Sequence, residues 1–152
     1  MPEKTGGGFL ISKIKQIQGR VFEKLLSEYG ISEFNGPQGR ILFVLWEHDG
    51  IPISELSKQT GLAKTTLTSM LDRLESSGHI ARQPDPSDRR SVRIRLTETA
   101  RALRPKYDEV SARMNAIFYG GFSDDEILAF ENALGKILEN LIKKENENER
   151  KN

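Results

Sequence analysis

Arginine side chains crowd a short segment in the second half of the chain, and anion binding is the chemistry that they could perform. Five of them lie within residues 82–95, namely Arg82, Arg89, Arg90, Arg93 and Arg95. Like charges this close repel one another, and an anionic partner such as a phosphate backbone offsets that repulsion. The segment is therefore a candidate for contact with nucleic acid, and the alternative is an ordinary solvated face.

The residues around these arginines predict a β-hairpin. A strand is expected over 79–83, turn-forming residues follow over 85–88, and a second strand is expected over 91–96. In the second strand, Arg93 and Arg95 alternate with apolar residues. The apolar residues are Val92, Ile94 and Leu96. A period of two predicts a strand with one buried face and one basic face.

Two short helices joined by a tight turn precede the hairpin. The first is predicted over 55–60, with Ser54 as its N-cap and Gly61 as the left-handed residue that ends it. The second is predicted to start at an N-cap, Thr65, and to stop at Gly78. Its apolar face consists of Leu67, Met70, Leu71 and Leu74. This pair indicates a helix-turn-helix, and the hairpin behind it indicates a winged helix.

Longer helices are predicted on both sides of this region. An apolar stripe at spacings of three and four runs through Leu10, Ile14, Ile17, Val21, Leu25 and Tyr29. Asn35 is predicted to cap the next helix, with Pro37 in its first turn. After the hairpin, Thr97 is predicted to cap a helix that Pro105 kinks. Ser123 and Glu126 form a capping box at the start of the last helix.

Composition bounds the class of protein. With 152 residues, of which 36% are hydrophobic and 30% charged, one soluble, mainly helical domain is expected. The absence of cysteine excludes disulfides, thiolate metal sites and cysteine-based redox sensing. No apolar run approaches the ~20 residues of a membrane span, and residues 1–8 lack a signal pattern, so a cytoplasmic protein is expected. The net charge is +1, but residues 63–105 hold nine cations and five anions.

Three pieces of the sequence, in this order and spacing, resemble the multiple antibiotic resistance regulator (MarR) family of winged-helix transcription factors. They are Leu62–Gly78, which ends in Leu71-Asp72-Arg73-Leu74-Glu75 and a glycine stop, the wing Asp85–Ser91, and the pair Leu96-Thr97. The similarity extends from about Leu10 to Ile142. It implies a mainly α fold with a small β-wing, and a homodimer that binds double-stranded DNA at a pseudo-palindromic operator.

The resemblance also implies a division of the chain. A disordered N-terminus is expected over 1–8, a helical dimerisation region over 9–34 and 97–145, a winged helix-turn-helix region over 35–96, and a frayed tail over 146–152. The apolar stripes of the terminal helices agree with a dimer, because they exceed what a lone winged domain could cover. An intramolecular bundle is the alternative.

On the second helix of the helix-turn-helix, six polar residues lie off the apolar stripe or just before it. They are Lys64, Thr65, Thr66, Thr68, Ser69 and Arg73. We expect Thr66 and Ser69 to face base edges, and the others to contact phosphates or bases. The alternative is that Thr65 only caps the helix and the rest are solvated. Relatives often carry a basic side chain at the position of Ser69, and a glycine at that of Thr99.

In the wing, Arg90 is the first candidate for contact with a narrow minor groove. Asp88 is expected to pair with Arg90, or to serve only the turn, and Arg89 to contact phosphate or the same groove. Arg93 is also included among the candidate DNA-binding residues of the wing, although Arg93 and Arg95 are expected to hold the backbone or surface charges. Asp72 is unexpected on a DNA-facing helix. We expect it to pair with an arginine at the base of the wing and to position the wing.

The expected function is a transcription regulator, a repressor that a small aromatic or phenolic effector releases. The effector could bind near Phe22, Phe43, Trp46 and Tyr107, although such residues are more often core. No cofactor, metal or enzymatic activity is expected, because His48 and His79 lack ligand-like neighbours and no Gly-rich phosphate loop is present. The alternative function is a dimeric winged-helix adaptor that binds protein and not DNA.

Overall fold

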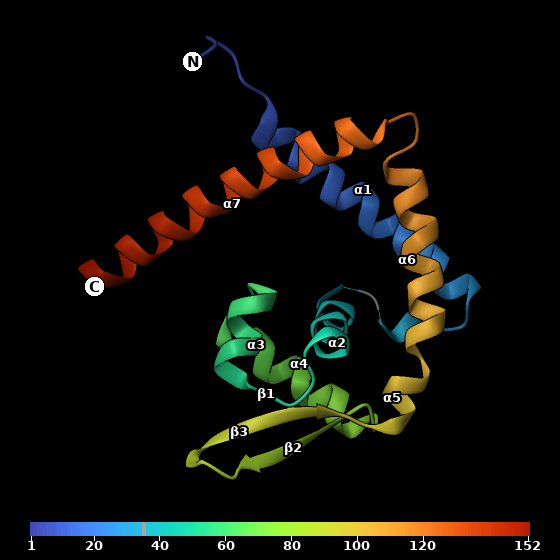
Figure 1. The fold of residues 1–152 in the computed structure, drawn as a ribbon, viewed down its shortest axis with the longest axis vertical. Coiled ribbons are helices and arrows are strands. Elements are labelled where there is room, and N and C mark those ends of the chain that lie inside the picture. The colour runs from blue at the N-terminus through green and yellow to red at the C-terminus, as the bar shows by residue number, and fades with distance from the viewer. Residues whose placement is uncertain (35) are drawn as a thin grey trace. The chain divides into compact units, whose positions relative to one another are not determined.

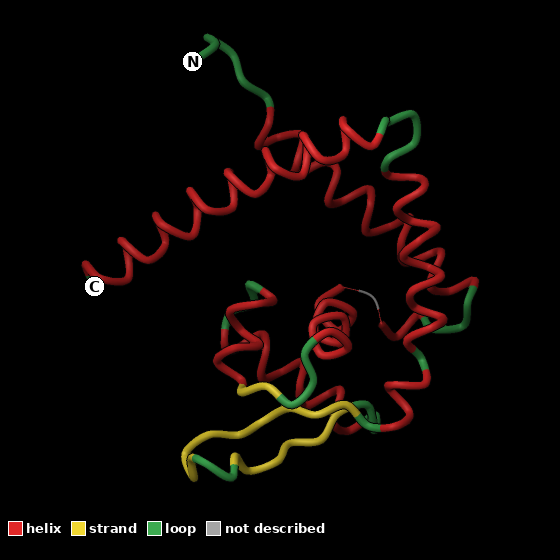
Figure 2. The backbone as a smooth tube through the Cα atoms, viewed as in Figure 1, coloured by secondary structure: helices red, strands yellow, loops and turns green. Residues whose placement is uncertain are grey.

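The computed structural model describes residues 1–34 and 36–152, and combines helices with a small sheet (Figures 1 and 2). The elements are α1 (Gly7–Glu28), a 3₁₀ turn η1 (Ser32–Phe34), α2 (Gly36–Glu47), β1 (Ile51–Pro52), α3 (Ile53–Thr60), α4 (Lys64–Ser76), β2 (Ile80–Asp85), β3 (Asp88–Leu96), α5 (Glu98–Ala102), α6 (Arg104–Phe118) and α7 (Asp124–Lys151). They form two compact units, residues 1–114 and 115–152. The predicted class, mainly α with a small β-wing, is confirmed.

The core of the first unit is one cluster of buried residues that extends from α2, the helix-turn-helix and the sheet to α1 and α6. Helix α2 packs against α3, α4 and β3, and α4 packs against β2. The sheet is antiparallel with strand order β1-β3-β2. The predicted apolar face of α4 is buried at Leu67, Leu71 and Leu74, while Met70 is half-buried. Burial of these leucines fixes which side of α4 remains exposed to solvent.

The starts of α3 and α4 correct two predicted N-caps. Pro52 and Ala63 occupy the cap positions, with ψ angles of 154° and 148°, and no side chain caps either helix. Ser54 and Thr65 are therefore helical residues. Lys64, which was predicted to precede the helix, is the first residue of α4. At both helices an extended backbone residue precedes the first helical residue. The side-chain hydroxyl groups that are statistically preferred at N-cap positions are therefore not used.

Several predicted ends are confirmed. Gly61 and Gly78 have φ angles of +70° and +78°, the left-handed conformation that glycine adopts at low cost. The Thr97 hydroxyl accepts a hydrogen bond from the N–H of Ala100, and Ser123 and Glu126 form the reciprocal capping box. The cap predicted at Asn35 lies outside the described residues.

Pro105 has a larger effect than the predicted kink. The helix after the hairpin is broken into α5 and α6, with Leu103 between them, and Pro105 falls in the first turn of α6. Proline has no N–H to donate to the carbonyl four residues earlier, and its ring clashes there. In place of a continuous ladder, the N–H of Leu103 donates to Ala100 O at 3.2 Å.

The wing is longer than predicted, and both chain ends are more helical. Strands β2 and β3 reach Asp85 and Asp88, so only a two-residue turn remains. Val92 is 36% exposed, which corrects its predicted place on the buried face, because the core ends below it. Helix α1 begins at Gly7, within the segment expected to be disordered. Helix α7 continues to Lys151, through the residues expected to fray.

The second unit contains the end of α6 and the whole of α7. Four aromatic rings pack together around the turn between them, at Phe118, Tyr119, Phe122 and Phe130. Helix α7 has no buried residue, and Leu128, Ile137, Leu138, Leu141 and Ile142 are exposed along it. Among the described residues, no helix has the length and apolar character needed to cross a membrane.

Candidate nucleic-acid interface

The exposed face of α4 carries the polar residues that the sequence singles out. All six are exposed: Lys64, Thr65, Thr66, Thr68, Ser69 and Arg73. They are presented as a group because the three buried leucines turn the opposite side of the helix to the core. In the turn before α4, the Ser57 hydroxyl donates to Leu62 O at 2.9 Å, and the Thr60 hydroxyl accepts from Leu62 N at 3.3 Å. These contacts fix α4 relative to α3.

The tip of the wing contains an irregularity in strand pairing. Pro84 pairs with Val92, but the next residue, Asp85, pairs with Asp88. The segment Arg89–Ser91 therefore bulges out of the ladder between the two pairs. A bulge bends the strand and redirects its side chains. Arg89 and Arg90 are both exposed on this bulge.

Asp85 holds the wing tip, a role that the sequence did not reveal. Its side chain is 8% exposed, and its carboxylate accepts hydrogen bonds from Ser87 N at 2.9 Å, Ser87 Oγ at 2.8 Å and Arg93 Nε at 3.0 Å. The bonds from Ser87, together with the charge of Arg93, lower the pKa of Asp85. An ionised carboxylate therefore joins the turn to the neighbouring strand.

Asp88 serves the backbone of the bulge. Its Oδ1 atom accepts a hydrogen bond from the N–H of Arg90 at 2.9 Å. Of the two roles considered for Asp88, this contact supports the turn-forming one. Within the described residues no ion pair joins Asp88 to the Arg90 guanidinium. The carboxylate orders the bulge that bears Arg90 and does not hold its side chain.

Arg93 and Arg95 lie against the body of the domain. Besides its bond to Asp85, Arg93 donates from a terminal nitrogen to Gly50 O at 2.7 Å. The Arg95 guanidinium covers Gly50, where an added Cβ would lie 3.1 Å from a guanidinium nitrogen. Arg93 thus has two of its three nitrogens occupied within the protein, which disfavours the DNA contact for which the sequence counted it with the wing arginines.

Asp72 forms an ion pair with an arginine at the base of the wing, which confirms the predicted contact. Arg82 in β2 donates to Asp72 Oδ1 at 2.8 Å and to Glu75 Oε1 at 3.0 Å. The backbone N–H of Arg82 also donates a hydrogen bond to Glu75 Oε2, at 3.3 Å. One arginine of the wing therefore pairs with two carboxylates of α4.

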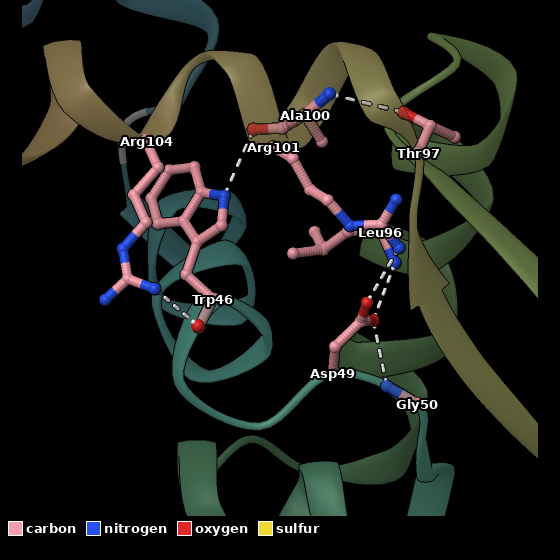
Figure 3. Close-up of polar contacts among 8 residues, drawn as sticks. All are labelled: Trp46, Asp49, Gly50, Leu96, Thr97, Ala100, Arg101 and Arg104. Atoms are coloured by element: carbon pink, nitrogen blue, oxygen red, sulfur yellow. Dashed lines mark hydrogen bonds and ion pairs between the residues drawn. The ribbon is translucent and has the colours of Figure 1, made fainter.

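The end of α2 is joined to β3, α5 and α6 by the contacts drawn in Figure 3. Asp49 Oδ1 accepts hydrogen bonds from Gly50 N at 2.8 Å and Leu96 N at 2.9 Å, while Oδ2 pairs with Arg101 at 2.9 Å. The Trp46 indole donates to Ala100 O at 3.1 Å, beside the helix break. In return Arg104 donates to Trp46 O at 2.7 Å.

These contacts reduce the number of cations available to an external anion. Arg82, Arg93, Arg101 and Arg104 have carboxylate partners within the chain. Across residues 63–105, all of which the structure describes, five cations have no ion pair: Lys64, Arg73, Arg89, Arg90 and Arg95. Four of the five lie on the exposed face of α4 or on the bulge of the wing.

The aromatic residues considered for an effector site are divided between core and surface. Tyr107 packs against Trp46 with ring centroids 4.9 Å apart, and against Phe22 at 5.9 Å. Burial raises the pKa of Tyr107 to about 12. Phe43 is exposed and takes no part in this packing. The packing of Tyr107, Trp46 and Phe22 agrees with the alternative interpretation, in which these residues belong to the core.

A helix-turn-helix followed by a paired and braced wing defines a winged helix-turn-helix protein, and comparison with known proteins specifies the family. The family model described as MarR family matches residues 34–92. The organic hydroperoxide resistance transcriptional regulator of Bacillus subtilis is 30% identical over 136 residues, covering 90% of this chain and 89% of that protein. The chain belongs to the MarR family of transcriptional regulators.

Two further similarities bear on function. HTH-type transcriptional regulator TtmR of Methylorubrum extorquens is 41% identical over 90 residues, which is 59% of this chain but only 45% of that protein. The chain thus spans less than half the length of this relative. A crystal structure of a mutant MarR from E. coli complexed with operator DNA matches at a TM-score of 0.77 and 30% identity, covering 86% of this chain and 92% of that one.

Proposed function

We propose that this protein is a sequence-specific DNA-binding regulator that acts as a homodimer on a pseudo-palindromic operator. Helix α4 enters the major groove, and the wing places Arg89 and Arg90 in the adjacent minor groove. The observation that carries this proposal is the distribution of unpaired cations. Carboxylates of the chain pair with Arg82 and Arg93, while Lys64, Arg73 and the two arginines of the bulge lie exposed without an ion pair in the described residues.

The proposed roles follow from this arrangement. Lys64 and Arg73 contact phosphates, while Thr65, Thr66, Thr68 and Ser69 face base edges or phosphates. Asp85 and Asp88 order the bulge, and Asp72 positions the wing through Arg82. We leave Arg93 out of the DNA contacts because its guanidinium is engaged with Asp85 and Gly50.

The homodimer is supported by apolar surface at both ends of the chain. Phe9, Leu10, Ile11, Ile14 and Ile17 are exposed on α1, and the stripe on α7 is exposed along its length. Apolar patches of this extent on a soluble chain mark an interaction surface. Two copies present two α4 helices, as a pseudo-palindromic site requires.

The regulatory sign and signal are further parts of the proposal. We infer a repressor that a small aromatic or phenolic molecule releases, as the family resemblance implies. The chain has no cysteine, so the signal does not act through thiol oxidation. The exposed ring of Phe43 on α2 is a candidate contact for such a molecule.

Selection of bound duplexes from a random DNA pool tests the proposal. Recovered sequences should share two related half-sites about one helical turn apart. With five unpaired cations in each protomer, the logarithm of affinity should fall with the logarithm of salt concentration at a slope of about −4 to −9. A protein-binding adaptor would show no such dependence. Release of the selected duplex by small phenolic acids then tests the effector.

A further inference from the structure

The exposed face of α4 has few side chains that read bases through paired hydrogen bonds. Arginine, lysine, asparagine and glutamine make such bidentate contacts in the major groove. In the first half of α4, where helices of this kind meet base edges, Lys64 at the first position is the only residue of these types. The other exposed side chains there are Thr65, Thr66, Thr68 and Ser69. The first arginine, Arg73, lies in the last turn of the helix.

The three threonines have no structural role that would explain them. Their side chains are exposed, and none of their hydroxyls bonds to another described residue. In contrast, Thr60 at the end of α3 is buried and donates to Leu56 O at 2.7 Å. Thr65 does not cap α4, because Ala63 occupies that position. Threonine is a weak helix former, so three of them on one exposed face lower helix stability without a compensating contact.

The charges beside the threonines divide into two kinds. Asp72 and Glu75 are both paired with Arg82, and one net negative charge remains in this cluster. Lys64 and Arg73 have no ion pair in the described chain and stand on either side of the threonines. Arg73 lies nine positions after Lys64, or about 13 to 14 Å along the helix axis. That separation is comparable to the ~12 Å width of the major groove.

We propose that α4 reads thymine through the methyl groups of Thr65, Thr66 and Thr68. A threonine methyl makes an apolar contact with the C5-methyl of thymine, while its hydroxyl can bond to either base. This inference rests on the proposed DNA binding and names the feature of the DNA that α4 selects. The protein therefore binds duplexes with T·A pairs opposite the threonines, and Lys64 and Arg73 hold the flanking phosphates.

Replacing thymine by uracil tests the inference directly. The exchange deletes the C5-methyl from the major groove and leaves base pairing and the minor-groove edges unchanged. Duplexes selected from the random pool are remade with uracil at one thymine at a time, and their affinities are measured. We expect a loss of about fourfold at each thymine that meets a threonine, the amount that one buried methyl group supplies.

Serine variants assign each contact. Thr65→Ser, Thr66→Ser and Thr68→Ser each delete the methyl and keep the hydroxyl, and circular dichroism verifies that α4 is retained. Each variant should abolish the uracil effect at one position. Thr99→Ser, at an exposed threonine of α5, should leave every uracil effect as in the parent protein.

Two results would overturn the inference. If duplexes are bound but uracil at every thymine is neutral, or if its effect persists in all three serine variants, α4 does not read thymine methyls, while the proposed function stands. If no duplex is recovered at low salt, the proposed function fails and the inference fails with it.

Discussion

At the scale of single residues, similar arginines have different environments. Arg90 lies exposed on the bulge of the wing, whereas Arg93, three positions along the same strand, bonds to Asp85 and Gly50. Alternation along a strand predicts which face a side chain occupies, but not which partner it meets. The partner decides whether a guanidinium remains free to contact DNA.

Arg90→Ala should weaken binding to the selected duplex by about 1–3 kcal/mol without lowering the thermal stability of the protein. The reason is that Arg90 has no ion pair in the described chain and is exposed on the bulge at the tip of the wing. Titration of labelled duplex measures the change. Arg150→Ala, near the end of α7, is the control and should bind normally. Equal affinity of Arg90→Ala and the parent would remove the wing from the interface.

Tyr107 predicts a pH dependence of stability. Burial raises the pKa of Tyr107 from 10.0 to about 12, so the folded protein keeps the proton longer than the unfolded chain does. Its contribution is complete below pH 10 and is lost as the pH rises toward 12, by on the order of 2 kcal/mol. Urea unfolding at pH 9 to 12 measures this loss. In Tyr107→Phe the free energy of unfolding should fall less between pH 10 and pH 12 than in the parent. If both proteins lose the same stability over this range, other groups cause the loss.

At the scale of elements, two clusters of contacts hold the wing and the helix break. Asp72 and Glu75 of α4 pair with Arg82 of β2. Asp49, which follows α2, pairs with Arg101 of α5. Asp49 joins elements that are distant in sequence, whereas Arg82 joins α4 to the strand that follows it. We expect the position of the wing relative to α4 to depend on these electrostatic contacts as well as on the core.

Asp72→Ala should weaken DNA binding even though it removes a negative charge from the proposed interface. Loss of that charge alone would tighten binding to phosphates, so a weaker complex isolates the positioning role. Because the Asp72 side chain is 65% exposed, the free energy of unfolding should change by less than about 1 kcal/mol. Asp72→Asn can still accept a hydrogen bond from Arg82 and should bind DNA better than Asp72→Ala. Unchanged affinity in Asp72→Ala would contradict the role.

Asp49→Ala should destabilise the protein more than Arg101→Ala. The first change leaves the N–H groups of Gly50 and Leu96 without the carboxylate that they bond to, at a cost of about 1–3 kcal/mol. The second removes a partly exposed ion pair and should cost less than about 1 kcal/mol. Chemical unfolding followed by the fluorescence of Trp46 compares the two. Equal losses would mean that the ion pair, and not the backbone contacts, holds this junction.

At the scale of the whole molecule, the two compact units differ in how their apolar residues are used. The unit of residues 1–114 buries a continuous core, whereas in the unit of residues 115–152 helix α7 buries no residue at all. A long helix with an exposed apolar stripe is stable in water when another surface covers it. The proposed second copy would provide that surface.

Leu138→Glu should shift the protein from dimer to monomer and weaken operator binding. Leu138 lies in the exposed apolar stripe of α7, and a charge there would be buried in the proposed dimer. Sedimentation at several concentrations measures the assembly. Ala129→Glu adds the same charge to the opposite side of α7, nine positions before Leu138, where the side chain is exposed, and should remain dimeric. A parent protein that sediments as a monomer would exclude the proposed dimer.

The amino-acid sequence was enough to predict the class of fold, the order of its elements and several of their ends. Gly61, Gly78 and the caps at Thr97 and Ser123 act within one turn of the chain, so local chemistry was enough to predict them. The apolar period of α4 also specified which of its residues are exposed. Prediction failed at the starts of α3 and α4, where an extended backbone residue took the place of the expected hydroxyl cap.

The tertiary structure decided which charges are free. Asp85 reaches Arg93, Asp49 reaches Leu96 and Arg101, and the strand register shifts where Arg89 and Arg90 are exposed. These contacts join residues that only the pairing of β2 with β3 and the packing of α2 bring together. No local pattern contains that information, because a charged side chain takes whichever partner the fold places within hydrogen-bond distance.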